Sequence, residues 1–363
     1  MHKPRMQLLA SFDIASLQYL DERGQTTQAL PDFATQDTLE ALYRQMTLAR
    51  MVDDRAVKMQ RTGQLGTYPS SLGQEAIGVG VAAAMAKEDV YCPNYRETGA
   101  LLERGVRIEE IYTIWGGDER GQNFCHVRED LPLSVPIATQ MLHGAGVAFA
   151  LKYKHEQLNQ PMRAAVTSGG DGATSKGDFY EAINLAGDWK LPLVVVINNN
   201  QWAISLSRSG QTACRTLAQK AIAAGIPSLQ VDGNDVIAVY QAVTEALQQA
   251  HAGGGPSLIE AVSYRLCDHT TADDASRYQP AEELKEAWAR EPLRRLRAYL
   301  GTLGAWGEAR EEAMQRELKE ILEESVRVYR QTPRDTATAI FDHLYETLPE
   351  AFVEQYQQLQ GDS

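Results

Sequence analysis

The sequence predicts an α/β protein whose core is a doubly wound, mostly parallel sheet flanked by helices. Between residues 164 and 262, short apolar runs of strand length alternate with longer segments whose apolar residues recur at helical spacing. Two polar turns, at residues 170–172 and 198–200, come directly after apolar runs. Open α/β sheets bind ligands at the carboxyl ends of their strands. The segments that predict the fold therefore also predict where its site lies.

The alternation gives a definite series of elements. We expect strands over residues 164–167, 193–197, 228–231 and 257–262, and helices over residues 174–189, 214–224 and 235–251. Upstream, the same periodicity predicts helices over residues 37–63 and 139–154, and small apolar residues predict a buried helix over residues 74–86. Residues 116–135 and 264–283 show no periodicity, so we expect long loops, which in compact domains are often functional.

The chain has 363 residues, which allows one large domain or two ordinary ones. We divide it into an N-terminal arm over residues 1–36, an α/β domain over residues 37–283, and a C-terminal helical extension over residues 284–363 packed on the same domain. The arm holds one strand-like patch at Ser16–Leu20 and a turn at Glu22–Gly24.

Composition excludes several kinds of protein. The formal net charge of −13 argues against nucleic acid as a partner, because phosphate contacts need clustered Lys and Arg. No apolar run approaches the roughly 20 residues of a membrane span. The start of the chain has a short basic head but no apolar core, which argues against a signal or transit peptide. The cysteines are widely scattered and form no CxxC pair, so we expect reduced thiols in a cytoplasmic protein.

The turn Gly170-Asp171-Gly172 has the residue types that a magnesium diphosphate needs. Glycines let the backbone approach a phosphate, and a helix N-terminus offers unpaired N–H groups to an anion. Mg²⁺ between Asp171 and the phosphates would remove their repulsion, and Asn200 at the end of the next strand can add an amide oxygen. The alternative is that Asp171 only caps a helix and the asparagines only turn the chain. The stretch from Asp171 to Asn200 fits one helix and one strand, which favours the site.

Longer segments add a family resemblance. GDGATSKGDFYEAINLAGDWKLP, followed by NNNQWAIS, resembles the thiamin diphosphate fingerprint of the alpha subunits of thiamin-dependent 2-oxo acid dehydrogenases. Residues 216–243 and 264–278 also resemble this family, and the similarity runs from about residue 18 to the C-terminal helices. It is closest to the bacterial two-subunit pyruvate dehydrogenase type. The resemblance implies the diphosphate-binding domain of the thiamin diphosphate-binding fold, oxidative decarboxylation of pyruvate, and reductive acylation of a lipoyl group.

The resemblance also implies a set of site residues. Those that would contact thiamin diphosphate are Tyr95, Arg96, Val135, Ile137, Gly170, Asp171, Gly172, Ala173, Asn200 and His269. Asp171, Asn200 and the main-chain carbonyl of Trp202 would hold Mg²⁺. The forked donors of Arg96 suit a diphosphate, although a surface Arg without a ligand is the alternative. Ile137 would lie near the aminopyrimidine and thiazolium rings, unless it only packs in the core.

The predicted catalytic residue is His269. The family places this His at the mouth of the site, and its ordinary pKa suits proton transfer or stabilisation of charge. A merely solvated loop His is the alternative, and for His126 in the loop 116–135 we prefer that alternative. Cys267-Asp268 stands where many relatives have His or Gly-Pro. Thr270 replaces a serine that is phosphorylated in mitochondrial members, and we do not predict that regulation for this chain.

Two further segments bear on ions and substrate. The loop before residue 139 resembles a monovalent-cation loop of branched-chain relatives, which makes K⁺ a further expected ion, through Ser134, Pro136, Thr139 and Gln140. Residues 63–76 resemble the active-site entrance. There, Thr67 stands where relatives often carry an aromatic residue, and Pro69 where animal pyruvate-type members show a His. The size of the substrate stays open, so a branched-chain 2-oxo acid or acetoin dehydrogenase alpha subunit is the alternative.

The resemblance also implies partners. Thiamin enzymes need a carboxylate that protonates the aminopyrimidine, and this carboxylate belongs to a second type of domain that we do not find in this chain. We therefore expect a beta subunit in an α2β2 assembly, a lipoyl domain of the acyltransferase, and a small 2-oxo acid substrate. A catalytically silent subunit is a weaker alternative, since Asp171, Asn200, Arg96 and His269 are all present. A nucleotide-binding regulator would need a GxxxxGK[ST] loop, which GDGATSKGD lacks.

Overall fold

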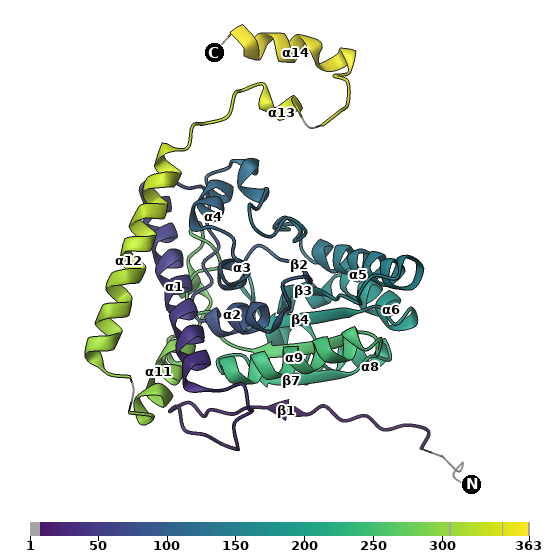
Figure 1. Ribbon diagram of the computed structural model, residues 1–363, viewed down its shortest axis with the longest axis vertical. Helices are drawn as coiled ribbons and strands as arrows, with labels where there is room; N and C mark the ends of the chain where they lie inside the picture. The colour runs from purple at the N-terminus through teal and green to yellow at the C-terminus, as the bar shows by residue number, and fades with distance from the viewer. Residues whose placement is uncertain (1–7, 305, 343, 362–363) are drawn as a thin grey trace.

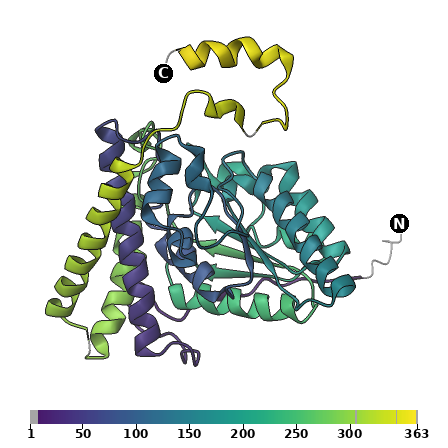
Figure 2. The same cartoon turned by 45° about the horizontal axis from the view of Figure 1, so that its top comes forward.

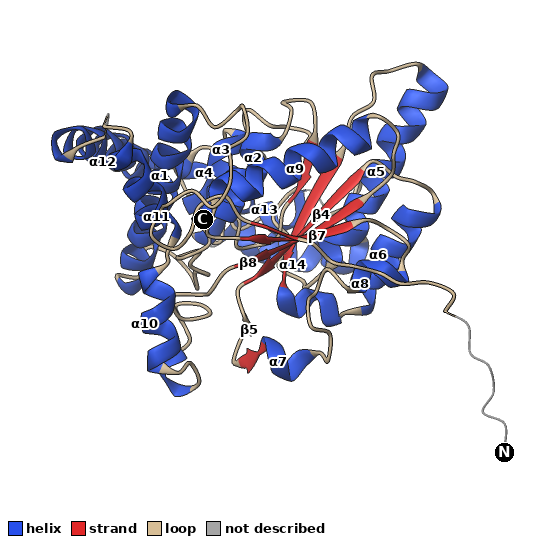
Figure 3. Ribbon diagram, turned by 90° about the horizontal axis from the view of Figure 1, so that it is seen from below, coloured by secondary structure: helices blue, strands red, loops and turns tan. Residues whose placement is uncertain are grey.

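A six-stranded parallel sheet forms the centre of the computed structural model, which describes residues 8–304, 306–342 and 344–361 (Figure 3). Its strand order is β1-β7-β8-β4-β3-β2. The strands are β1 (Ser16–Leu17), β2 (Val90–Cys92), β3 (Ala165–Gly170), β4 (Leu193–Asn199), β7 (Ser228–Asp232) and β8 (Ser257–Val262). Every neighbouring pair is parallel. The predicted α/β class with a parallel sheet is confirmed.

Helices cover both faces of the sheet, as a parallel sheet requires (Figure 1). On one face, α5 (Thr139–Leu158) and α6 (Gly177–Asp188) share a core with β3 and β4. On the other, α2 (Glu75–Ala84) and α9 (Val236–His251) pack on the same strands. Eight of the ten residues of α2 are buried, which confirms the prediction of a tightly packed helix from its small side chains.

A second layer of helices lies outside α2. The long helix α1 (Gln36–Arg61) packs against α11 (Pro292–Thr302) and α12 (Glu308–Gln331). The shorter helices around them are α3 (Thr98–Arg104), α4 (Ile108–Trp115) and α10 (Ala281–Ala289). In contrast, α13 (Ala339–Asp342) and α14 (Glu350–Gly361) stand apart from the sheet in both views (Figures 1 and 2). The proposed division into an arm, a domain and an extension stays a prediction.

The sequence prediction was wrong between residues 200 and 224. A helix was expected over residues 214–224, but within this stretch only α8 (Lys220–Ala223) is helical. It is preceded by the hairpin β5 (Trp202–Ala203) and β6 (Leu206–Ser207), and by α7 (Arg208–Gln211). Side chains satisfy the backbone here in place of a helix: Thr212 Oγ1 accepts from Cys214 N at 3.2 Å, and Gln219 Oε1 accepts from Arg215 N at 3.2 Å.

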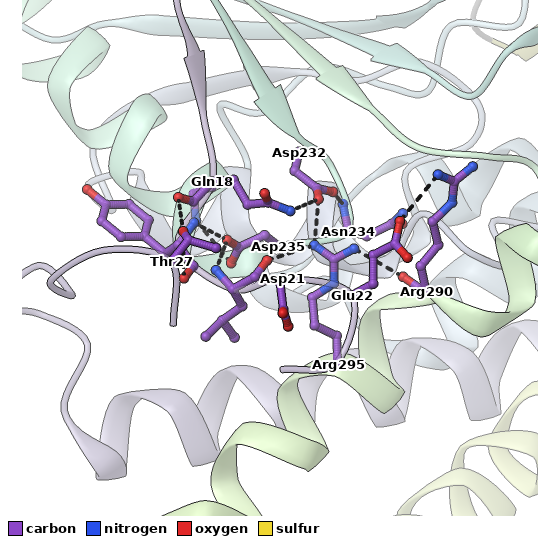
Figure 4. A network of polar contacts seen from close by, with 12 residues as sticks. Gln18, Asp21, Glu22, Thr27, Asp232, Asn234, Asp235, Arg290 and Arg295 are labelled. Carbon is purple, nitrogen blue, oxygen red and sulfur yellow. Dashed lines mark hydrogen bonds and ion pairs between the residues drawn. The ribbon is translucent and has the colours of Figure 1, made fainter. Parts of the chain in front are cut away.

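The segment after residue 15 is bonded to the edge of the sheet (Figure 4). β1 pairs with β7, and Asp235 Oδ2 accepts from the main-chain N–H groups of Tyr19 and Leu20 at 2.7 and 2.8 Å. Asp235 also caps α9, because its Oδ1 accepts from Ile237 N at 3.1 Å. Arg295 Nη1 pairs with Asp232 at 2.6 Å. Residues 1–7 of the predicted arm lie outside the described residues.

An ion pair at the amino end of the sheet predicts a pH-dependent stability. His251 Nε2 lies 2.8 Å from Asp89 Oδ1, and this hydrogen bond raises the pKa of His251. The folded state therefore holds the proton more tightly than the unfolded state, so the contribution is complete below about pH 6.5 and is lost as the pH rises through the folded pKa. We expect His251→Gln to lower the free energy of unfolding by less than about 1 kcal/mol at low pH. Thermal denaturation at about pH 5.5 and about pH 9 checks this, and an equal loss at both would contradict it.

Candidate active site

A cavity of about 290 Å³ lies at the carboxyl ends of β3 and β4. It is where the sequence placed the site, because the register pairs Gly170 at the end of β3 with Asn198 near the end of β4. The predicted residues that line it are Tyr95, Arg96, Ile137, Gly170, Asp171, Gly172, Ala173, Asn200, Trp202 and His269. Val135 does not line it and is 59% exposed, so its role stays a prediction.

The glycines of the turn bring the main chain to the cavity wall. A Cβ on Gly172 would come within 2.7 Å of the Ala203 side chain, so only glycine fits between the turn and β5. A Cβ on Gly170 would meet nothing within 4 Å and would project into open space beside the turn. Residues Asp171–Ser175 form a 3₁₀ helix, and α6 begins only at Gly177. The expected helix therefore starts with one tighter turn, which holds Asp171 and Gly172 at the cavity.

Asp171 is the carboxylate of this site. Its side chain is buried, and Gln211 Nε2 donates to Oδ2 at 2.7 Å. Burial raises the pKa of Asp171 because the charged form loses its hydration. A divalent cation at this carboxylate would lower that pKa again and offset the cost of burial. The chemistry of the residues therefore fits a bound Mg²⁺.

Asn200 is oriented by a residue that the sequence reasoning missed. Its Nδ2 donates to Gln74 Oε1 at 3.0 Å, which leaves Oδ1 as the atom available to a metal, beside a weak contact from Trp202 N at 3.2 Å. Gln74 also lines the cavity, and its buried Nε2 has no hydrogen-bond partner among the described residues. Unsatisfied buried donors are rare and indicate a missing acceptor. An amide directly before α2, which is apolar after its first residue Glu75, was the signal that could have identified it.

The third expected metal ligand is held in a strained turn. Trp202 lies between two non-glycine residues with left-handed backbone, Gln201 at φ 71° and Ile204 at φ 56°. Ala138, which also lines the cavity, has φ 70°. Such conformations cost about 1–3 kcal/mol each and persist only where the surroundings fix them. The Trp202 carbonyl accepts a long bond of 3.4 Å from Arg265 Nη1 and lies at the cavity wall.

Arg96 and His269 form one hydrogen-bonded unit in the lining of the cavity. Arg96 Nη2 donates to His269 Nδ1 at 3.1 Å and to the His269 carbonyl at 2.8 Å, while Nη1 donates to the Ser70 carbonyl. A guanidinium can only donate, so Nδ1 must accept, and the proton of a neutral His269 lies on Nε2. Tyr95 packs edge-on against the His269 ring with 6.4 Å between the ring centres.

The surroundings keep His269 neutral. Burial, together with the guanidinium groups of Arg96 and Arg265, lowers the pKa of His269 to about 4. Between about pH 4 and 6.5 the unfolded chain would bind a proton that the folded chain does not, so this group makes the fold more stable as the pH rises through that range. At neutral pH, His269 is a hydrogen-bond donor through Nε2 and not a cation.

Comparison with known proteins decides the family. The profile of the family described as "Dehydrogenase E1 component" matches residues 43–338. The chain belongs to the dehydrogenase E1 component family. It is 39% identical over 344 residues to the pyruvate dehydrogenase E1 component subunit alpha of Staphylococcus aureus strain Mu50, covering 94% of this chain and 91% of the relative. The protein of the same name from Staphylococcus epidermidis is 38% identical over the same shares.

Other residues that were predicted for this dehydrogenase E1 component divide into two groups. Ser134, Pro136 and Gln140 of the expected K⁺ loop line the cavity, and Thr139 begins α5. Whether K⁺ binds there stays a prediction. His126, Thr67 and Pro69 do not line the cavity. Among the described residues, no group of three or more His, Cys, Asp and Glu could hold a metal, so any Mg²⁺ here would need phosphate or water oxygens as well.

Gln74 provides a direct test of the cavity of this dehydrogenase E1 component. Gln74→Met keeps the length of the side chain but removes the free donor and the acceptor for Asn200, so we expect about a 10-fold loss of thiamin diphosphate affinity. Gln74→Glu keeps the acceptor and adds a negative charge, so we expect a larger loss. Isothermal titration calorimetry with Mg²⁺ measures both. Unchanged affinity in Gln74→Met would contradict a contact with the cofactor.

Proposed function

We propose that this chain is the alpha subunit of a thiamin diphosphate-dependent 2-oxo acid dehydrogenase that decarboxylates pyruvate and passes the acetyl group to a lipoyl group of an acyltransferase. One observation carries the proposal: Asp171, Asn200 and the Trp202 carbonyl share a cavity with Arg96 and His269. These are an oxygen donor set for Mg²⁺, a cation for a diphosphate and a hydrogen-bond donor for a reacting group. The relatives from both Staphylococcus species are named pyruvate dehydrogenase E1 component subunit alpha, which supports the same substrate.

Each residue has a distinct role in this proposal. Asp171, Asn200 and Trp202 would hold Mg²⁺ against the diphosphate, and the main-chain N–H groups of Gly172 and Ala173 would donate to its oxygens. When bound, thiamin diphosphate supplies the nucleophilic carbon and the electron sink for decarboxylation. His269 Nε2–H would donate at the mouth, where negative charge develops on the substrate. The sequence reasoning and the cavity lining support the same roles.

The cavity wall also supports the beta subunit as a partner. Among the described lining residues Asp171 is the only carboxylate, so the group that protonates the aminopyrimidine has to come from elsewhere. A set of exposed apolar side chains, here called the apolar strip, consists of Ile137 in the cavity lining, Leu142, Phe149 and Tyr153 on α5, and Trp189. The ring centres of Phe149 and Trp189 lie 5.3 Å apart. Exposed patches of this kind mark protein interfaces. We place the beta subunit of an α2β2 assembly on this strip.

The remaining parts of the proposal concern the setting. We propose a bacterial, cytoplasmic enzyme whose acetyl acceptor is the lipoyl domain of the acyltransferase. None of the helices among the described residues is both long and apolar enough to cross a membrane. A branched-chain 2-oxo acid or acetoin dehydrogenase is the second candidate, because Thr67 and Pro69, which left the size of the substrate open, lie outside the cavity lining.

Copurification with the candidate beta subunit tests the proposal. The complex, supplied with thiamin diphosphate and Mg²⁺, is assayed for carbon dioxide release from pyruvate and from 2-oxoisovalerate. Turnover of acetoin is measured separately with an electron acceptor. We expect the highest kcat/KM with pyruvate. A preference for 2-oxoisovalerate or acetoin would show that pyruvate is not the substrate but would leave the proposed thiamin-dependent reaction unchanged. A complex that binds no cofactor and turns over none of the three would overturn the proposal.

A further inference from the structure

Asp53 is a buried carboxylate outside the cavity. It lies on α1 with 3% of its surface exposed. Four hydrogen bonds reach it, all from residues 68–71. Ser71 N and Ser71 Oγ donate to Oδ1 at 2.7 and 3.1 Å, Tyr68 Oη donates to Oδ1 at 3.1 Å, and Ser70 Oγ donates to Oδ2. A single carboxylate therefore fixes one short segment of the chain.

The segment that Asp53 holds lies between α1 and the loop of His269. Tyr68 N donates to Thr271 Oγ1 at 3.0 Å, and Thr271 N donates to the Tyr68 carbonyl at 2.9 Å. Leu266 N donates to the Leu72 carbonyl at 3.3 Å. Ser70 follows Tyr68 by two residues, and His269 precedes Thr271 by two residues. The main-chain carbonyls of Ser70 and His269 both accept hydrogen bonds from the guanidinium of Arg96. A path of hydrogen bonds therefore leads from Asp53 through Ser70 to Arg96.

We propose that Asp53 is a positioning residue for the diphosphate of the cofactor, acting through the Ser70 carbonyl to fix the guanidinium of Arg96. This inference rests on the proposed function, in which Arg96 binds the diphosphate. Arg96 has no carboxylate among the acceptors described here, so carbonyl groups and His269 Nδ1 set its direction. The contact of the remaining Arg96 donors with phosphate depends on that direction. A shift of the Ser70 carbonyl would turn Arg96 away from the anion.

Packing alone does not explain a carboxylate at this position. Hydroxyl and N–H donors and the Glu75 carboxylate face Asp53, and burial raises the pKa of Asp53. Burying a charge is costly unless hydrogen bonds compensate for it, so an apolar side chain would suit the core better. The two carboxylate oxygens of Asp53 accept hydrogen bonds from several donors at once, and these bonds fix the position of the segment that carries the Ser70 carbonyl.

A double-mutant cycle tests the path. The alpha–beta complex is titrated with thiamin diphosphate and, separately, with inorganic pyrophosphate, both with Mg²⁺. Asp53→Asn replaces one carboxylate oxygen by an NH₂ group, which then faces other hydrogen-bond donors. We expect this substitution to lower the affinity for both ligands about 10-fold. In an Arg96→Met background the same change should alter neither affinity by more than about twofold. Equal losses in both backgrounds, or no loss in either, would overturn the proposal.

Control variants separate positioning from general destabilisation. Asp235 is an equally buried aspartate that binds main-chain N–H groups far from Arg96, so Asp235→Asn should lower the melting temperature without weakening pyrophosphate. If it weakens pyrophosphate as much as Asp53→Asn does, the proposal fails. Ser70→Ala removes the Oγ contact to Asp53 together with one long bond of 3.3 Å that Leu72 N donates to Ser70 Oγ, and it covers the case in which Asp53→Asn does not fold. We expect it to weaken pyrophosphate about threefold, only when Arg96 is present. No effect of Ser70→Ala in either background would count against the path.

The cycle also distinguishes this inference from the function on which it rests. A wild-type complex that binds thiamin diphosphate while the two substitutions act independently refutes the role of Asp53 and leaves the function standing. A wild-type complex that binds neither ligand refutes both.

Discussion

Replacing Asp171 by asparagine is expected to abolish magnesium-dependent binding of thiamin diphosphate. The change preserves the shape of the side chain and can keep the contact to Gln211, but it removes the only carboxylate among the described residues that line the cavity. Substitutions one layer outside a metal site already cost about 10- to 100-fold in affinity, and the loss of a charged ligand costs at least as much. We therefore expect the affinity for thiamin diphosphate to fall by about 100-fold or more.

Calorimetry of the alpha–beta complex, with and without Mg²⁺, measures this loss. Wild-type protein should lose most of its affinity when Mg²⁺ is removed, whereas Asp171→Asn should bind equally weakly in both conditions. Asp178 is a matched control, because it follows in the first turn of α6 and does not line the cavity. Asp178→Asn should behave as wild type. A Mg²⁺ dependence that survives in Asp171→Asn would remove Asp171 from the metal site.

The sheet and the two strand ends of the site were predictable because local pattern and burial agree there. Residues 193–197 form a continuous apolar run, and all of β4 is buried between helices. Residues 257–262 were predicted as a strand and match β8. When such runs end in a polar turn, the turn lies at the edge of the sheet. That is why Asp171 and Asn200 could be brought together from the sequence alone.

What could not be predicted depends on contacts between distant parts of the chain. β2 has only three residues, too few for a periodic pattern, and it is a strand because it pairs with β3. Gln74 reaches Asn200 across 126 positions of the chain, and Tyr68 is fixed by Thr271 across 203. The hairpin after Asn200 needs left-handed backbone at Gln201 and Ile204, which no local preference favours. In each case tertiary structure overrides the local signal.

Two substitutions of His269 should separate its two roles, and one of them should cost most of the activity. In His269→Asn, Oδ1 can replace Nδ1 as the acceptor for Arg96, but the donor at Nε2 is lost. We expect thiamin diphosphate affinity to change little and kcat to fall by about 100-fold or more, the usual cost of removing one preorganised hydrogen-bond donor to developing negative charge. In His269→Gln, the amide Nε2 of the new glutamine can donate in place of the ring Nε2, but the acceptor that the ring Nδ1 offered to Arg96 is lost. We expect that variant to keep more of its kcat and to bind the cofactor more weakly.

The pH dependence gives an independent check on the same residue. Because burial, together with two guanidinium groups, holds the pKa of His269 at about 4, its ring should not titrate in the cofactor-free protein between about pH 5.5 and 8. NMR of ¹⁵N-labelled His side chains, assigned with His269→Asn, measures this directly. Arg96→Met removes one of the two charges and should raise the pKa of His269 toward its ordinary value. A His269 that titrates near pH 6.5 in the wild type would contradict the neutral donor, and with it the expectation that His269→Asn and His269→Gln affect different steps.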